Sequence, residues 1–168
     1  NNLGYLYSLG REYEKAEQVY AGVLRRQPHM ELAERNLRTS LAQSGRRPPE
    51  VLAQVGEFRR LEALLQARRY GPEALALARR VADHFPEDAR SRFYLGNLEL
   101  LSGDASKAEA DLRRVLAKEP RNAAAMVNLA QALKRLGKAQ EAAAILRSAL
   151  ALEPGNAAAA AELKALAQ

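Results

Sequence analysis

Three prolines stand at one spacing, with Pro86, Pro120 and Pro154 each 34 residues after the last. Each proline closes a matching string of small and apolar residues. A fixed period of this length predicts stacked helix–turn–helix units, because a single unit cannot bury its apolar face alone. Such arrays form one continuous core and leave a long groove along one side. The sequence therefore indicates how the chain binds much more than what it binds.

Residues at equal distances before the prolines match in kind from one unit to the next. One unit supplies Leu95, Gly96, Gly103, Ala108, Leu112, Val115 and Pro120, which match Leu129, Ala130, Gly137, Ala142, Leu146, Ala149 and Pro154. The unit that ends at Pro86 follows the pattern less closely. The start of the chain repeats it well, with Leu3, Gly4, Tyr7, Tyr13, Ala16, Tyr20, Val23 and Pro28.

Small residues stand within the predicted first helices, at Gly4, Gly96 and Ala130. Glycine in a helix costs up to ~1 kcal/mol relative to alanine, so we expect two helices to cross closely there. We expect the facing positions on the second helices to be alanines such as Ala16 and Ala108, where a larger side chain would overpack.

The units also carry helix-stop signals. Gly103 and Gly137 follow apolar runs, where a left-handed residue commonly ends a helix. The prolines end each second helix, because proline lacks the backbone donor and biases the residue before it away from helix.

The pattern resembles the tetratricopeptide repeat (TPR), whose signature is Leu-Gly and Tyr in the first helix and Ala, an aromatic residue and Pro in the second. The likeness covers most of residues 1–28 and 55–168. It implies an all-α fold, a right-handed superhelical array of antiparallel helix pairs in the manner of a TPR-like α-solenoid.

The period breaks between Pro28 and Pro86, which are 58 residues apart. Residues 30–44 predict a helix with Leu37 and Leu41 inward, but the residues that follow are too few for a partner helix and two connections. We therefore predict residues 1–46 as one unit plus a capping helix, 47–54 as a stiff proline-containing connector, and 55–168 as three units with a C-terminal capping helix. One unbroken superhelix with an irregular repeat, or a helix missing from this sequence, remain alternatives. Because the chain starts without methionine inside a first helix, we also expect a preceding part of the protein.

Few features indicate chemistry. The sequence lacks the glycine-rich phosphate loops and the serine elbow of hydrolases, so we expect no enzyme activity and no cofactor. His29 and His84 have no second ligand at metal-binding spacing, so we expect no metal. No apolar run is long enough to span a bilayer. With no cysteine, the cytoplasm and the periplasm stay equally open.

The resemblance implies that the first helix of each unit lines a concave groove. We expect partner-binding residues there, with Tyr5 and Ser8 in equivalent places near the start. The set is Arg59, Arg90, Phe93, Asn97, Asn128, Gln131, Lys134 and Arg135. They predict a basic groove with one aromatic contact residue, suited to an acidic or amide-rich peptide or helix. In the alternative interpretation Phe93 packs between first helices and the arginines are simply solvated.

The net charge of +6 raises the question of nucleic acid. Arginine pairs such as Arg79-Arg80 and Arg113-Arg114 recur, several pairs end second helices, and the pairs are interspersed with acids; only nine residues are aromatic. Because a phosphate track and stacking platforms are both lacking, we expect no nucleic-acid partner. Twenty arginines against six lysines fit a GC-rich, bacterial composition better.

The favoured function is a protein–protein interaction scaffold or adaptor that binds a partner segment in the groove. The alternatives are a regulatory or docking region of a larger protein whose catalytic domain is absent from this chain, and an array that self-associates through its first and last helices.

Overall fold

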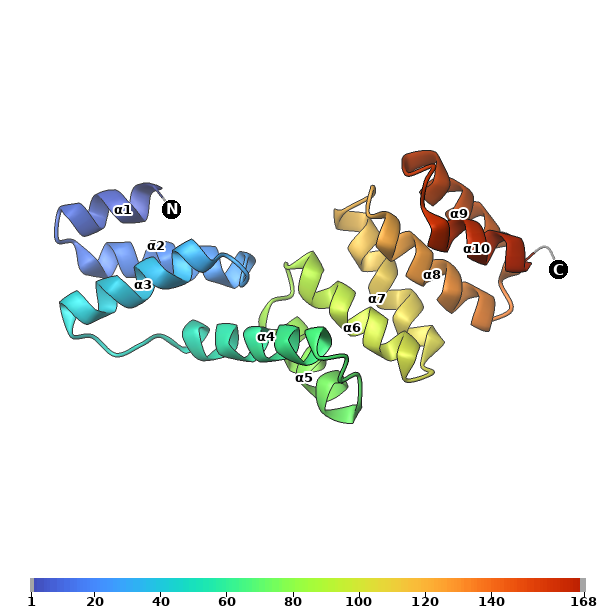
Figure 1. The fold of residues 1–168 in the computed structure, drawn as a ribbon. Helices are drawn as coiled ribbons and strands as arrows, with labels where there is room; N and C mark the ends of the chain where they lie inside the picture. The colour runs from blue at the N-terminus through green and yellow to red at the C-terminus, as the bar shows by residue number, and fades with distance from the viewer. Residues whose placement is uncertain (1, 167–168) are drawn as a thin grey trace. The chain divides into compact units, whose positions relative to one another are not determined.

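The computed structural model describes residues 2–166, and within that range the chain is helical with no strand (Figure 1). The helices are α1 (Asn2–Leu9), α2 (Tyr13–Arg26), α3 (Glu31–Ser44), α4 (Glu50–Gln66), α5 (Pro72–His84), α6 (Ala89–Leu101), α7 (Ala105–Lys118), α8 (Ala123–Arg135), α9 (Ala139–Leu152) and α10 (Ala157–Leu166). Neighbouring helices such as α6 and α7, or α8 and α9, pair closely. The predicted all-α class of paired helices is confirmed.

The chain forms two compact units. Among the described residues, the first contains residues 2–69 and 80–88, and the second contains residues 70–79 and 89–166. Helix α5 thus contributes residues to both. The compact units do not divide at the predicted connector, because the residues on both sides of it belong to the first unit.

The connector itself is shorter than the predicted range 47–54. Helix α4 begins at Glu50, directly after Pro49, whose backbone is extended. Pro49 is therefore the last extended residue before the helix, and its lack of a backbone donor removes no hydrogen bond of α4. The stretch from Val51 to Val55 therefore belongs to α4, and both of these side chains are buried.

The helix stops lie where the sequence predicts them. Helices α5, α7 and α9 end two residues before Pro86, Pro120 and Pro154. Gly103 and Gly137 have φ values of 92° and 76°, a left-handed conformation that favours glycine. These local signals are confirmed.

The close helix crossings are also present, but their partners differ from the predicted alanines. A Cβ atom added to Gly4 would lie 2.7 Å from the ring of Tyr20, and one added to Gly96 would lie 3.0 Å from Leu112. A side chain at Gly4 would force the Tyr20 ring to move, whereas at Gly96 the Leu112 side chain would have to give only slightly, and Ala130 occupies the matching position of the next unit. Ala16 and Ala108 are fully buried as well.

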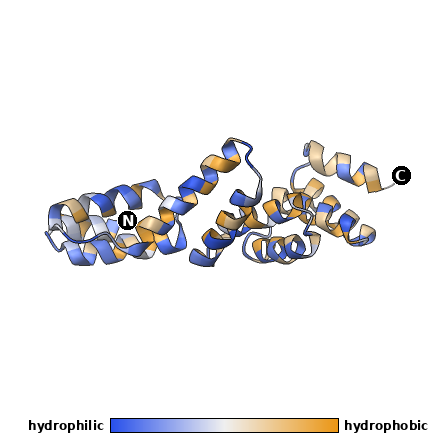
Figure 2. Cartoon of the chain, turned by 90° about the horizontal axis from the view of Figure 1, so that it is seen from below, coloured by the Kyte–Doolittle hydropathy of each residue, from blue (hydrophilic) through white to orange (hydrophobic). Residues whose placement is uncertain are grey.

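Each unit has its own core. In the first unit, Phe58 of α4 is fully buried, and its ring centroid lies 6.3 Å from that of Phe85 in an edge-to-face arrangement. In the second unit, one cluster joins side chains of α6 to α10, among them Leu112, Leu133 and Leu146. Figure 2 shows the hydrophilic and hydrophobic residues interleaved along the helices, as expected when one stripe of each helix faces a core.

The two helices predicted as caps are present. Helix α3 packs against α2 with Leu37 and Leu41 buried, and α10 packs against α9 and α8. The last two residues of the predicted C-terminal cap lie outside the described residues. No helix within residues 2–166 has both the length and the apolarity needed to cross a membrane.

Candidate functional site

Seven of the eight predicted partner-binding residues lie on two first helices of the second unit, α6 and α8. The arginines and the lysine are exposed, whereas the aromatic ring and the three amides are half-buried. We name this set the α6–α8 face, and it consists of Arg90, Phe93, Asn97, Asn128, Gln131, Lys134 and Arg135.

Two members of this face donate hydrogen bonds to the carboxylate of Glu162. The Gln131 side-chain amide donates a hydrogen bond to Glu162 Oε1 at 2.9 Å, and Lys134 Nζ donates to Oε2 of the same residue at 3.2 Å. Glu162 comes from α10, which packs against α8. The pair therefore binds both oxygens of one carboxylate, with one neutral and one charged donor.

Glu162 itself was not among the predicted residues, although the repeat register could have found it. It stands eight residues after Pro154, as Asn128 stands eight residues after Pro120. The prediction of α10 as a capping helix does not include this equivalence.

Arg135 has a local structural partner. Its Nη1 donates to the backbone carbonyl of Leu100 near the end of α6. The last carbonyls of a helix lack partners within the helix, so a neighbouring guanidinium satisfies one of them. Arg135 thus ties α8 to the end of α6.

Phe93 packs against the buried cluster of the second unit, with its ring half-buried and tilted against Tyr94. The interpretation in which it packs between helices thus has direct support. The remainder of the ring is exposed to solvent.

The eighth predicted residue, Arg59, lies on α4 in the first unit, surrounded by acids. Its guanidinium is 3.4 Å from a Glu62 oxygen and 3.7 Å from oxygens of Glu31 and Glu34. Its Nη2 also donates to the carbonyl of His29 at 3.5 Å. Since three carboxylates surround one guanidinium, the positive charge of Arg59 is already balanced within this unit.

A groove of ≈ 210 Å³ runs between α1 and α3 in the first unit. Tyr5 and Ser8 were predicted to line it, but the polar residues of α3 were not. The prediction of residues 30–44 as a capping helix does not assign them to a groove, yet Asn36 stands eight residues after Pro28, as Asn128 does after Pro120. The full lining is Tyr5, Ser8, Leu9, Tyr20, Asn36, Thr39, Ser40 and Gln43.

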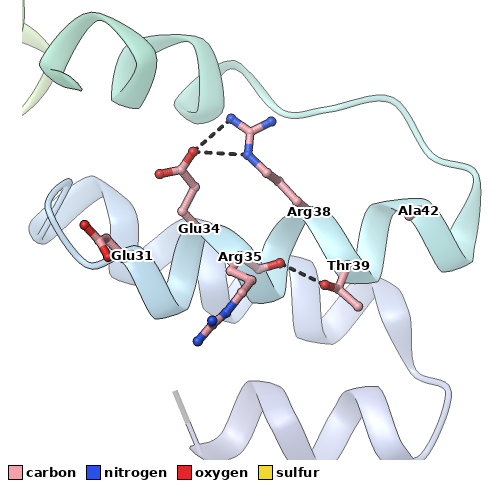
Figure 3. Close-up of a pocket in the computed structure, with 6 residues that line it drawn as sticks. All are labelled: Glu31, Glu34, Arg35, Arg38, Thr39 and Ala42. Atoms are coloured by element: carbon pink, nitrogen blue, oxygen red, sulfur yellow. Dashed lines mark hydrogen bonds and ion pairs between the residues drawn. The ribbon is translucent and has the colours of Figure 1, made fainter. Parts of the chain in front are cut away.

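A second hollow of ≈ 550 Å³ in the first unit is lined by α3 alone (Figure 3). Arg38 donates from Nε and Nη2 to Glu34 Oε1 at 3.1 and 2.9 Å. Figure 3 shows this pair on one side of the helix and Arg35 on the other. Because Arg38 is neutralised on its own helix, this hollow offers less positive charge than its arginines suggest.

Charges on the second helices of the second unit are paired with one another. Arg113 donates to Glu141 at 2.6 Å, and Lys138 lies 2.8 Å from Glu109. The hydrogen bond from Lys138 holds the pKa of Glu109 below its usual range, and the bond to Glu141 raises the pKa of Arg113. Paired charges of this kind offer no continuous track for phosphates.

Both histidines have carboxylate neighbours that sequence spacing could not reveal. His84 Nε2 lies 3.3 Å from Glu57 Oε2, and His29 Nδ1 lies 3.6 Å from Asp88 Oδ1. These neighbours come from segments far apart in the chain. Within residues 2–166, however, no three His, Cys, Asp or Glu side chains are grouped to hold a metal ion.

Comparisons with known proteins agree with this geometry. Two sequence models of the tetratricopeptide repeat match, one over residues 58–113 and one over residues 99–167. No curated protein matches the chain significantly in sequence.

Solved structures with the same fold cover much of the chain. The TPR domain of Arabidopsis OM64 is 23% identical with a TM-score of 0.63, and the match covers 68% of this chain and 93% of that one. The second TPR domain of human RPAP3, solved in complex with the HSP70 peptide SGPTIEEVD, is 23% identical with a TM-score of 0.62, covering 68% and 95%. YrrB, described as a TPR protein with an unusual peptide-binding site, is 17% identical with a TM-score of 0.59, covering 97% and 89%. Because the two sequence models together span residues 58–167 and the helices pair as these structures do, the chain belongs to the tetratricopeptide repeat family.

Proposed function

We propose that the chain is a non-catalytic protein–protein interaction module, a scaffold or adaptor that holds an acidic segment of a partner on the α6–α8 face. The observation that carries the proposal is the pair of hydrogen bonds that Gln131 and Lys134 donate to the Glu162 carboxylate. A site that binds one carboxylate of its own chain has the donors and the charge to bind another. The same role suits a docking region within a larger protein.

The polar surface beside Gln131 and Lys134 fits an extended acidic segment. Arg90 adds a positive charge on α6, and Asn97 and Asn128 add amide groups that can both donate and accept. The similar RPAP3 domain holds a peptide whose last residues include two glutamates and one aspartate. This likeness supports an acidic ligand class without identifying the partner.

The competition between Glu162 and a partner carboxylate provides the test. Replacing Glu162 by glutamine removes the internal carboxylate, so we expect an acidic peptide to bind several-fold more tightly, because a larger fraction of the face is free to bind. Fluorescence anisotropy measures this with a labelled peptide that carries four glutamates. The same peptide with glutamines in their place is expected to bind weakly.

Glu141→Gln is the matched control, because it removes a paired carboxylate from the second helix α9 rather than from α10. It is expected to leave the peptide affinity unchanged. Equal binding of the acidic and the neutral peptide, or no change with Glu162→Gln, would contradict the proposal.

Self-association is a second candidate function, favoured by an unusually exposed apolar surface on α1. Leu3 and Leu6 are 53% and 62% exposed. At the same distances before their prolines, Leu95 and Leu98 are buried, and so is the corresponding pair on α8. Each later unit covers this position, so the surface of α1 suits a helix of a second copy. Helix α10 offers exposed small residues such as Ala160 and Ala161, which permit a close approach.

For this second candidate we expect the molar mass from light scattering to rise with protein concentration. Leu6→Glu is expected to abolish that rise, since it puts a charge into the apolar contact. Leu101→Glu changes a leucine on α6 that is also more than half exposed, and it is expected to leave the rise in mass intact. A mass that stays monomeric at every concentration would exclude self-association.

A further inference from the structure

A buried polar triad lies between α6 and α7 of the second unit. It consists of Arg92, Glu99 and Asp111, whose positions are apolar in the other units of the chain. The equivalents of Arg92 are Phe58 and Met126, those of Glu99 are Tyr7, Leu65 and Leu133, and those of Asp111 are Val19, Leu77 and Ile145. In this one repeat, all three positions carry polar residues, whereas their equivalents in the other units are apolar.

The members of the triad lie within interaction range of one another. Arg92 Nη1 donates to Asp111 Oδ1 at 2.8 Å, and Glu99 lies close enough to Asp111 for the two carboxyl groups to interact. Glu99 and Asp111 are 2% and 8% exposed. The other carboxyl oxygen of Glu99, Oε2, is buried without a hydrogen-bond partner.

Two buried carboxyl groups in contact cannot both be charged without a large cost, so one of them tends to keep a proton. Arg92, and Arg114 at 3.5 Å, favour the charged form of Asp111. Glu99 faces Asp111 from α6, Asp104 adds a further negative charge, and Arg79 of α5 adds a positive one. The proton therefore belongs on Glu99.

We propose that Glu99 and Asp111 form a proton switch in the α6–α7 hairpin, in which a proton held between the two carboxyl groups fastens α7 to α6 and its loss loosens the pair. Protonated Glu99 donates to the Asp111 carboxylate. After deprotonation the two carboxylates repel, and the buried Oε2 becomes part of an uncompensated charge.

The direction of the pH dependence follows from the same contacts. Burial, and then the charge of Asp111, raise the pKa of Glu99 to about 7. A carboxyl group whose pKa is higher in the folded than in the unfolded state stabilises the fold fully below the unfolded pKa. This contribution is lost as the pH rises through about 7, so the switch operates near neutral pH.

Hydrogen exchange of the intact chain tests the switch without any ligand. We expect the protection of amides in α6 and α7, corrected for intrinsic exchange, to fall about tenfold or more between pH 5.5 and 8, a tenfold change corresponding to one pKa unit. Glu99→Gln keeps a permanent donor toward Asp111 and is expected to make the protection independent of pH over this range. Glu109→Gln is the matched control on α7, because the pKa of Glu109 is shifted downward and its effect lies at lower pH.

A second variant and a direct titration keep the test decisive. Glu99→Leu introduces the residue that the repeat has at Leu65 and Leu133, and it should also remove the pH dependence. The carboxyl ¹³C resonance of Glu99 in the unaltered chain should titrate near pH 7. A resonance that titrates in the ordinary range for glutamate, or the same loss of protection in Glu99→Gln as in the parent chain, would overturn the switch.

Because α6 also carries Phe93 and Asn97, loosening it would alter the α6–α8 face, and this consequence rests on the proposed function. The exchange experiment uses no peptide, so the switch and the binding role can fail independently.

Discussion

Replacing Phe58 by alanine is expected to lower the free energy of unfolding of the first unit by about 3–5 kcal/mol. Phe58 is fully buried, and its ring lies 6.3 Å from Phe85 and 6.5 Å from His29. It therefore joins α4 to the segments that follow α5 and α2. Alanine would leave a cavity at this junction and remove the edge-to-face contact with Phe85.

The loss should be confined to the first unit, because the stability of repeat arrays is close to a sum of local terms. Hydrogen exchange should show faster exchange in α2 to α4, while α8 and α9 keep their protection. Leu9→Ala, at a position 65% exposed in the same unit, should change stability by about 0.5 kcal/mol or less. Uniform loss of protection across both units would mean that the chain unfolds as one cooperative body instead.

Replacing Lys134 by glutamate is expected to weaken binding of an acidic peptide about 10- to 100-fold. Hydrogen bonds to charged groups contribute about 1.5–3 kcal/mol, and each 1.4 kcal/mol is a factor of ten in affinity. The new carboxylate would also lie next to Glu162, which accepts from Lys134 at 3.2 Å. The side chain is 42% exposed, so the fold should tolerate the change.

The control for this variant is Arg147→Glu, which makes the same change in net charge on α9, a second helix. It should leave the affinity unchanged, as measured by calorimetric titration. If both variants weaken binding equally, the effect comes from net charge alone and the α6–α8 face is not the site.

The local structure could be predicted from the sequence where the signal is short-range. The prolines end α5, α7 and α9, and Gly103 and Gly137 adopt the left-handed conformation that ends a helix. The start of α4 was missed for a local reason too. A proline with extended backbone, such as Pro49, fits within a stiff connector and also just before the first residue of a helix, so residues 50–54 could be assigned either way.

The partners of charged residues could not be predicted, because they depend on which helices meet. Lys134 meets Glu162 across 28 residues of sequence, and Arg59 meets acids of α3. The triad around Glu99 could be predicted only in part. Its departure from the repeat is visible in the sequence, but the contact between Glu99 and Asp111 becomes evident only when α6 and α7 are packed together.

The most direct measurement of the binding role is an NMR titration that follows the side-chain amide signals of asparagine and glutamine during addition of the four-glutamate peptide. Asn97, Asn128 and Gln131 lie on the α6–α8 face, so their signals should shift in a saturable manner. Asn122 and Asn156 donate to Glu119 and Glu153 in the turns before α8 and α10, so their signals should stay in place. Shifts confined to these turn residues, or no saturable shift at Asn97, Asn128 and Gln131, would contradict a carboxylate-binding face on the first helices.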